Sequence, residues 1–310
     1  MEKKTKFNTI VNKLIERPCY LTNGAGFLAK KFNVDKDTIY DAKRQARDLI
    51  ERKEYNPEFK RLFFDIETSY NIGKFWSVGY KKNITPSDVI KERAVICISY
   101  KWENEDKIHN LRWDENQCDK EILKEFSKIM ETSTEVIGHN SNRFDIPWLR
   151  TRCLYHRIPF PTYVKSLDTY SKSKSMFNFQ SNKLDYIAKF LNVGGKISTG
   201  GLELWDNIIL HKDEEAMQKM IEYCNNDVLI LEDVFKVIIN YIKPNTHVGV
   251  YEGGNLWCCP NCGSDKVNYI KPTVTTKGVV QRVMKCTKDK SDFVISNTTY
   301  KKYLENGNQE

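Results

Sequence analysis

The sequence predicts a mixed α/β protein whose central sheet is flanked by helices, with a helical segment before it and a small β-rich module after it. Hydrophobic residues make up 40% of the 310 residues and aromatic residues 12%, which is enough for a packed core. Short apolar runs bounded by turns begin at Arg61 and later alternate with segments of helical periodicity. We therefore expect three parts, over residues 1–60, 61–242 and 243–310.

The first part is expected to be helical over residues 1–58, with a break at Pro18 and a second start near Gly24. Residues 24–53 resemble a helix-turn-helix, because a short helix is followed by a turn at Asn33–Val34, a capping Asp35 and a basic second helix. An ordinary helical hairpin that is structural or binds protein shares this pattern. In the nucleic-acid interpretation, the polar face that contacts DNA is formed by Lys36, Thr38, Lys43, Arg44 and Arg47.

The central part begins with three predicted strands, in RLFFDIETS, RAVICISYKW and KIHNLRW. Helical periodicity follows in DKEILKEFSKIME, then a strand in TEVIGHN and a helix in PWLRTRCLYH. Further on, an amphipathic helix is predicted in KLDYIAKFLNV and a long one in EEAMQKMIEYCNNDVLILEDVFKVIINYIK, which Pro244 ends. This order indicates one mixed sheet with helices packed against it. For residues 245–310 we expect a small β-rich module that ends in a polar tail.

The net charge of +8 is concentrated at the two ends of the chain. Residues 1–61 hold 15 Lys and Arg against 9 Asp and Glu, and residues 243–310 hold 10 against 6. Basic ends around a slightly acidic centre indicate that the ends approach a polyanion such as nucleic acid. Surplus lysine that serves only solubility is the alternative.

No run approaches the ~20 apolar residues that span a bilayer, and the charged N-terminus lacks the apolar stretch of a signal peptide. We therefore expect a cytoplasmic protein with no membrane partner. Thiols stay reduced in the cytoplasm, so the nine cysteines do not indicate a disulfide framework. Cys258, Cys259, Cys262 and Cys286 gather near the C-terminus, which predicts a metal site there.

Acidic side chains occur in the first predicted strand, where a buried strand should be apolar. Asp65 and Glu67 are two positions apart, so both lie on one face. Two buried like charges need a compensating cation, and hard cations such as Mg²⁺ or Mn²⁺ bind through carboxylate oxygen. Taken alone, this strand also fits the edge of a sheet, with its polar face in water.

Two further elements carry acid groups. Asp145 follows a predicted strand just before a helix start, where an isolated Asp is usually the helix N-cap. Tyr223 and Asp227 are four residues apart and share one face of the long helix. Val228 and Leu231 make the neighbouring positions apolar, so a plain solvated Asp is less natural there.

Three segments of the central part resemble the motifs of a known family. The segments FDIET, GHNSNRFDIPWL and YCNND resemble the three exonuclease motifs of the DEDD superfamily, in the version with tyrosine in the third motif. They are most similar to the proofreading domain of family B DNA polymerases, and SNKLDYIAKFLNVGGK resembles the segment between its second and third motifs. The resemblance covers about residues 61–242. Nothing downstream is long enough for a polymerase domain, so we expect a stand-alone nuclease.

The resemblance implies a ribonuclease-H-like fold and 3′→5′ removal of nucleotides by hydrolysis with two Mg²⁺ or Mn²⁺ ions. It implies that Asp65 bridges both metals and that Glu67 and Asp227 complete the site that holds the attacking water. Asp145 would hold the second metal, directly or through water. Tyr223 would orient the attacking water.

Several other side chains near these motifs are candidates for binding the terminal base or for acid–base chemistry. Phe64, Phe144 or the Phe75–Trp76 pair could stack on the base, although each fits a core aromatic better. His139 is a candidate base, but support of its loop beside Asn140 fits it better.

The C-terminal cysteines resemble part of a zinc ribbon. In WCCPNCGS, Cys259 and Cys262 are followed by Gly263 as in a zinc knuckle. The second half of a ribbon would lie at MKCTKDK, where only Cys286 is present and Asp289 takes the place of the missing cysteine. The fourth ligand therefore stays open between Asp289, Cys258 and none. A module held together by its small core alone is the alternative to structural zinc.

The leading hypothesis is a metal-dependent 3′→5′ exonuclease that hydrolyses DNA from its 3′ end in replication, repair or recombination. The basic helix-turn-helix and ribbon would hold the DNA. One alternative is an RNA 3′-end trimming exonuclease similar to the ribonuclease D group, which uses the same four acids. The other is a DNA-binding regulator on a nuclease-derived fold. The intact acidic set argues against a regulator, because carboxylates near phosphates do not help binding.

Overall fold

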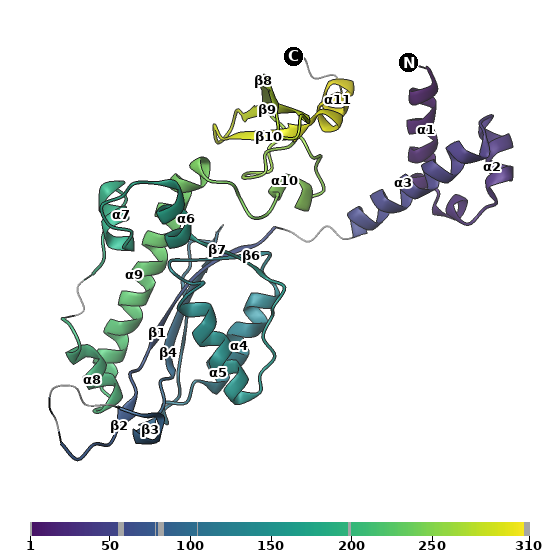
Figure 1. Ribbon diagram of the computed structural model, residues 1–310. Coiled ribbons are helices and arrows are strands. Elements are labelled where there is room, and N and C mark those ends of the chain that lie inside the picture. The colour runs from purple at the N-terminus through teal and green to yellow at the C-terminus, as the bar shows by residue number, and fades with distance from the viewer. Residues whose placement is uncertain are drawn as a thin grey trace.

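The structure, a computed structural model, describes residues 2–54, 59–77, 79, 84–103, 105–197 and 200–306 (Figure 1). The expected helical segment and the expected polar tail extend into residues 55–58 and 307–310, which lie outside this description. Among the helices of the described ranges, none is both long and apolar enough to cross a membrane.

A five-stranded mixed sheet forms the central part, in the order β5–β4–β1–β6–β7. β4 pairs antiparallel with both β5 and β1, whereas β6 pairs parallel with both β1 and β7. The sequence did not predict β7, because KSLD contains a single apolar residue and gives no period-two signal. The strands are β1 (Arg61–Thr68), β4 (Val95–Trp102), β5 (His109–Arg112), β6 (Glu135–Gly138) and β7 (Lys165–Asp168).

Helices cover both faces of this sheet (Figure 1). On one face lie α4 (Lys120–Glu131) and α5 (Asp145–His156), and on the other lies α9 (Glu214–Ile238), which is followed by η3 (Ile239–Tyr241). In the described part of the connection from β7 to α9 lie the shorter helices α6 (Thr169–Met176), α7 (Leu184–Phe190) and α8 (Glu203–Ile209). A small second sheet pairs β2 (Ile72–Gly73) with β3 (Val89–Lys91), which follows η2 (Pro86–Asp88).

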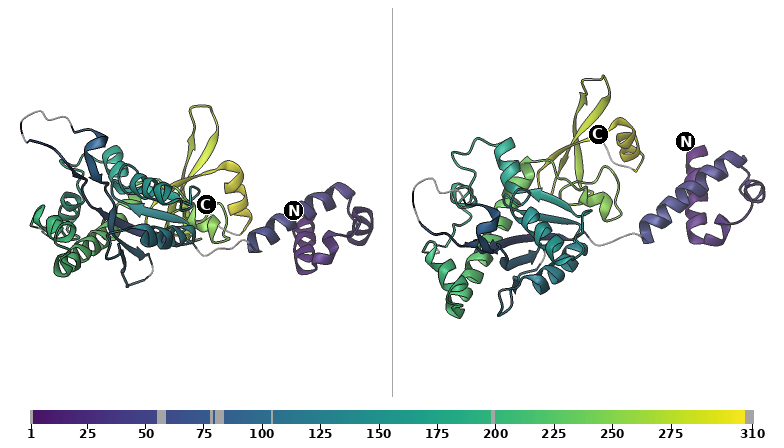
Figure 2. Two further views of the ribbon diagram at one scale, coloured as in Figure 1. Left: turned by 90° about the horizontal axis from the view of Figure 1, so that it is seen from below. Right: turned by 60° about the horizontal axis from the view of Figure 1, so that its bottom comes forward.

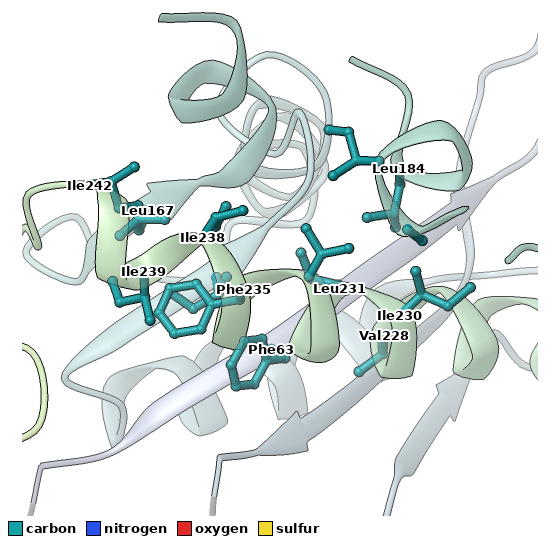
Figure 3. Packing of buried hydrophobic residues seen from close by; sticks show 14 residues of the cluster. Phe63, Leu167, Leu184, Val228, Ile230, Leu231, Phe235, Ile238, Ile239 and Ile242 are labelled. Carbon is teal, nitrogen blue, oxygen red and sulfur yellow. The ribbon is translucent and has the colours of Figure 1, made fainter. Parts of the chain in front are cut away.

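The alternation of side chains along β1 divides them between the two faces of the sheet. Leu62 and Phe64 pack with α4 and α5, whereas Phe63 packs on Phe235 of α9 with 5.4 Å between ring centroids (Figure 3). Asp65 and Glu67 share the face of Phe63 and therefore lie toward α9. β1 pairs with β4 on one side and β6 on the other. The edge-strand interpretation of these acids is therefore wrong.

The N-terminal part has its own hydrophobic cluster, built from α1 (Glu2–Glu16), η1 (Pro18–Leu21), α2 (Ala25–Phe32) and α3 (Lys36–Glu54). The turn between α2 and α3 has the expected chemistry. Asn33 adopts the left-handed conformation with φ 52°, and Oδ1 of Asp35 accepts a hydrogen bond from the N–H of Thr38 at 2.6 Å.

The C-terminal part is an antiparallel sheet in the order β10–β9–β8, from which the β8–β9 hairpin projects (Figure 2). Its elements are α10 (Val248–Tyr251), β8 (Val267–Val274), β9 (Val280–Cys286), β10 (Asp292–Ser296) and α11 (Asn297–Glu305).

Residues 297–305 form α11, a helix that the sequence did not predict. Tyr300 and Tyr303 on this helix are buried against the sheet, and the hydroxyl of Tyr303 donates to the carbonyl of Val267 at 2.9 Å. Exposed lysines between the tyrosines give the helix its polar composition.

Candidate active site

The acids of the first and third motifs face each other across the contact between β1 and α9. Asp65 and Glu67 lie on the face of β1 that α9 covers, and Tyr223 and Asp227 lie one helical turn apart on α9. Sγ of Cys224, also on α9, lies 3.5 Å from Oδ2 of Asp65. The packing of this strand on this helix therefore brings the two motifs together.

Asp145, the acid of the second motif, belongs to α5, which lies on the opposite face of the sheet from α9. It is the first residue of α5, and only 3% of its surface is exposed. The N–H of Ile66, which lies between Asp65 and Glu67, donates to Oδ1 of Asp145 at 3.3 Å. Phe144 occupies the N-cap position of α5, so the interpretation of Asp145 as a helix cap is wrong.

The loop between β6 and α5 is held in place by a residue that the sequence did not single out. The carboxylate of Asp168, at the end of β7, accepts from the backbone N–H of Asn140 at 2.9 Å and of Asn142 at 3.1 Å, and it also caps α6. The loop begins after Gly138, the last residue of β6. A Cβ on Gly138 would lie 2.4 Å from Cβ of Ser141, so only glycine fits at this position. Through its hydrogen bonds to Asn140 and Asn142, Asp168 holds the loop that precedes Asp145.

His139 supports the same loop. Its Nε2 lies 2.9 Å from the carbonyl oxygen of Asn182, which can only accept, and its Nδ1 lies 2.9 Å from the hydroxyl of Thr169. Burial lowers the pKa of His139 to about 4, so the ring is neutral near pH 7. Both ring nitrogens are occupied, which agrees with loop support and leaves neither available as a base.

The sequence interpretation also missed a lysine. Nζ of Lys196 forms an ion pair with Asp227 and lies 3.1 Å from the hydroxyl of Tyr223. The side chain of Lys196 is 31% exposed, against 4% for that of Asp227. Lys196 ends the segment SNKLDYIAKFLNVGGK, but a lysine after two glycines in a polar loop carries no pattern that separates it from a solvated one.

The acids strongly perturb one another. Burial first, and then the charge of Asp227, raise the pKa of Glu67 to about 8. Burial raises the pKa of Asp145 to about 7, and burial together with the neighbouring carboxylates raises the pKa of Asp65 well above its usual range. Burial also raises the pKa of Tyr223 to about 12, so its hydroxyl keeps its proton. Lys196 opposes the shifts of the carboxyls but supplies only one positive charge.

This set fits hard divalent cations. All its ligand atoms are oxygen, and within the described ranges four carboxylates face one ammonium, so positive charge is lacking there when the acids are ionised. Oδ1 of Asp227 is buried, and no group in the described part of the chain donates a hydrogen bond to it. A buried carboxylate oxygen without a donor is costly unless a cation binds it. Asp65, Glu67, Asp145 and Asp227 could therefore hold Mg²⁺ or Mn²⁺.

The aromatic candidates for base stacking differ in their exposure. Phe64 is fully buried on the opposite face of β1, and Phe144 packs against that same cluster. Phe75 and Trp76 are 63% and 106% exposed, so the structure leaves only this pair free to meet a substrate among the four candidates.

One predicted DNA contact in the N-terminal part needs correction. Lys43 is buried, 8% exposed, and its ammonium donates to the backbone carbonyl of Asn23, so it ties α3 to the start of α2. The helical repeat places it on the inner side of α3, beside the buried Ala42 and Ala46. The others remain on the surface, with Thr38 engaged in the Asp35 cap. The exposed basic side chains among them are Lys36, Arg44 and Arg47.

The C-terminal ligand candidates form a second group, in another part of the chain. Cys259, Cys262, Cys286 and Asp289 lie together, with their ligand atoms all within 4.8 Å of one another. Cys258 is not part of this group.

The sequence matches the model of the RNase H superfamily over residues 89–239. The match begins after β1 and covers the strands and helices from β3 to α9. It agrees with the observed sheet order and with the helices on both faces. The central part is RNase H-like. The ribonuclease-H-like fold class expected from the sequence is thus confirmed, and an RNase H-like part with this carboxylate set indicates a nuclease that acts on nucleic acid.

None of the curated proteins matches the chain in sequence. Among solved structures, it is similar to the family B DNA polymerase from the hyperthermophilic archaeon Pyrobaculum calidifontis, with 17% sequence identity and a TM-score of 0.46. That similarity covers 59% of this chain but only 25% of the polymerase chain.

Proposed function

We propose that this protein is a 3′→5′ exonuclease that hydrolyses DNA with two divalent cations, Mg²⁺ or Mn²⁺. The observation that carries the proposal is the convergence of Asp65, Glu67, Asp145 and Asp227 from three elements. In a structural ion pair the charges balance. Among the described residues, by contrast, this set has an excess of carboxylates, and a buried oxygen of Asp227 has no hydrogen-bond donor. Such a set suits a site that gathers cations around a phosphodiester.

The chain's own groups would have distinct roles in this reaction. When bound, the cations would lower the pKa of the attacking water and stabilise the leaving 3′ oxygen. The four carboxylates would hold the cations. Tyr223 keeps its proton, so its hydroxyl can orient the attacking water by a hydrogen bond. Lys196 adds a fixed positive charge beside Tyr223 and Asp227, where a phosphate would be attracted.

The preference for DNA with a 3′ end rests on the motifs and on the charge distribution. The order of the four acids and the tyrosine is that of the proofreading exonuclease motifs. The basic residues at both ends of the chain, +6 over residues 1–61 and +4 over residues 243–310, suit backbone contacts to a polyanion.

The test uses a 5′-labelled single-stranded DNA, with an RNA of the same sequence, in Mg²⁺ or in EDTA. We expect the DNA to shorten stepwise from its 3′ end in Mg²⁺ only, and a 3′ phosphorothioate cap to block it. Asp65→Asn and Asp227→Asn should lower the rate by roughly two or more orders of magnitude, because a lost carboxylate leaves a cation under-coordinated. Tyr223→Phe should cost less, since it removes one orienting hydrogen bond.

A matched control lies on the same helix. Asp233 is half exposed and pairs with Lys236 at 3.9 Å, so Asp233→Asn should retain wild-type activity. If RNA is degraded faster than DNA, the enzyme is an RNA-trimming exonuclease. If closed circles are cut, it is an endonuclease. If neither nucleic acid is cut while DNA is bound, the protein is a DNA-binding regulator.

A further inference from the structure

We propose that Cys259, Cys262, Cys286 and Asp289 bind one zinc ion, with Asp289 as the fourth ligand. This site belongs to the C-terminal part and does not depend on the proposed nuclease activity. The sequence left the fourth ligand open, and the structure favours one of the alternatives by geometry.

The spacing of the ligand atoms suits a tetrahedral ion. Sγ of Cys262 lies 3.6 Å from Sγ of Cys286, and Sγ of Cys259 lies 3.2 Å from Oδ2 of Asp289. With zinc–sulfur bonds of about 2.3 Å, tetrahedral geometry places two sulfurs about 3.8 Å apart. Small movements of these side chains therefore complete the coordination. Three thiolates and one carboxylate favour zinc over hard cations, which prefer all-oxygen sites.

The first half of the site has the backbone of a zinc knuckle. The N–H of Cys259 donates to the carbonyl of Ser264 at 2.8 Å, and the N–H of Gly263 donates to the carbonyl of Cys259 at 3.0 Å. Gly263 has φ 73°, a conformation that glycine adopts without strain. The backbone of this turn therefore brings Cys259 and Cys262 together within the ligand group.

The second half of the site is the turn after β9, whose last residue is Cys286. Oδ1 of Asp289 accepts from the N–H and the hydroxyl of Ser291 at 3.0 and 2.7 Å, and Ser291 in turn accepts from the N–H of Cys286 at 2.9 Å. The other carboxylate oxygen of Asp289, Oδ2, faces Sγ of Cys259. One carboxylate oxygen is thus fixed by the protein while the other faces the thiols, as expected of a metal ligand held by its outer partners.

Cys258 packs elsewhere. A Cβ on Gly249 would lie 2.6 Å from Cβ of Cys258, and a Cβ on Gly254 would lie 3.2 Å from its Sγ. These two glycines therefore form the close-packed surroundings of the Cys258 side chain at α10, and its role is that of a buried core residue.

The knuckle also contacts the nuclease part of the chain. Asn261, between the first two ligands, is buried, and its Nδ2 donates to the carbonyl of Ile239 just beyond α9 at 3.2 Å. The ion therefore orders the turn by which the C-terminal part rests on the helix that carries Tyr223 and Asp227.

The test measures zinc in the purified full-length protein by mass spectrometry, before and after dialysis against EDTA. Wild type should hold about one zinc per chain, as should Cys258→Ala. In Asp289→Asn, release of zinc to a competing chelator should be roughly tenfold or more faster. Asp289→Cys should restore slow release, because it completes a set of four thiolates. Circular dichroism of each variant distinguishes loss of zinc from loss of the fold.

Three results would overturn the proposal. The first is a folded wild-type protein without zinc. The second is loss of zinc in Cys258→Ala with retention in Asp289→Asn, which would make Cys258 the fourth ligand. The third is a Cys262–Cys286 disulfide, seen in the intact mass under non-reducing conditions.

Discussion

The substitution Glu67→Gln should stabilise the protein at alkaline pH when divalent cations are absent. Burial and the charge of Asp227 raise the pKa of Glu67 from 4.5 to about 8. A carboxyl group whose pKa is higher in the folded state favours folding most below its unfolded pKa. This contribution is fully present below pH 4.5 and is lost as the pH rises through about 8. Glutamine has no proton to lose, so the variant should escape this loss.

The size of the effect follows from the shift. One pKa unit corresponds to about 1.4 kcal/mol, and most of the interval between 4.5 and 8 lies between pH 5.5 and pH 8. With a reduction for the partial exposure of the side chain, the free energy of unfolding of the wild type should fall by about 2 to 3 kcal/mol over this range because of Glu67 alone. The advantage of Glu67→Gln should grow by the same amount, while its nuclease activity is lost.

The assay is urea unfolding in EDTA at pH 5.5 and pH 8, followed by circular dichroism. Glu222→Gln, an exposed position on α9, is the control and should behave as the wild type at both pH values. Adding Mg²⁺ at pH 8 should stabilise the wild type more than Glu67→Gln, because only the wild type has all four proposed ligands. If the difference in free energy of unfolding between Glu67→Gln and the wild type does not grow from pH 5.5 to pH 8, Glu67 does not lie among the other acids and the proposed site is wrong.

Two further predictions concern basic residues. Lys196→Ala should lower the free energy of unfolding in EDTA by about 2 kcal/mol, because a largely buried Asp227 loses its partner, and saturating Mg²⁺ should remove much of this loss. Equal free energies of unfolding of the wild type and Lys196→Ala in EDTA would contradict the ion pair. Replacing Lys36, Arg44 and Arg47 together by alanine should lower the slope of log affinity for duplex DNA against log salt by roughly one unit for each lost phosphate contact. An unchanged slope, measured by fluorescence anisotropy, would mean that these helices face a protein.

Much of the site could be predicted because its parts follow local periodicities. The two-residue spacing of Asp65 and Glu67 places them on one face whatever the rest of the chain does, and the four-residue spacing of Tyr223 and Asp227 does the same on a helix. That these faces meet requires that β1 be an inner strand, which the two acids alone leave open and which the pairing of β1 with β4 and β6 decides.

Other features of the site depend on contacts between distant segments and leave no local signal. Asp168 organises the loop before Asp145 from the end of a four-residue strand that is too short to show a period. Lys196 reaches Asp227 from a loop 31 residues earlier. The charge of Lys43 predicts a place on the polar face, whereas its helical position is an inner one, from which its long side chain reaches the carbonyl of Asn23, just before α2.

The arrangement of α9 on β1 explains how the chain tolerates its acids without cations. At one end of the contact, Phe63 and Phe235 pack ring against ring in a buried cluster (Figure 3). At the other end, Glu67 faces Asp227. Removing a core phenylalanine typically costs about 3 to 5 kcal/mol, which is comparable to the cost inferred for ionising Glu67 in the folded protein. The apolar half of the contact therefore holds the two elements together against the repulsion in the polar half, and cations that bind the carboxylates relieve that repulsion where the reaction would take place.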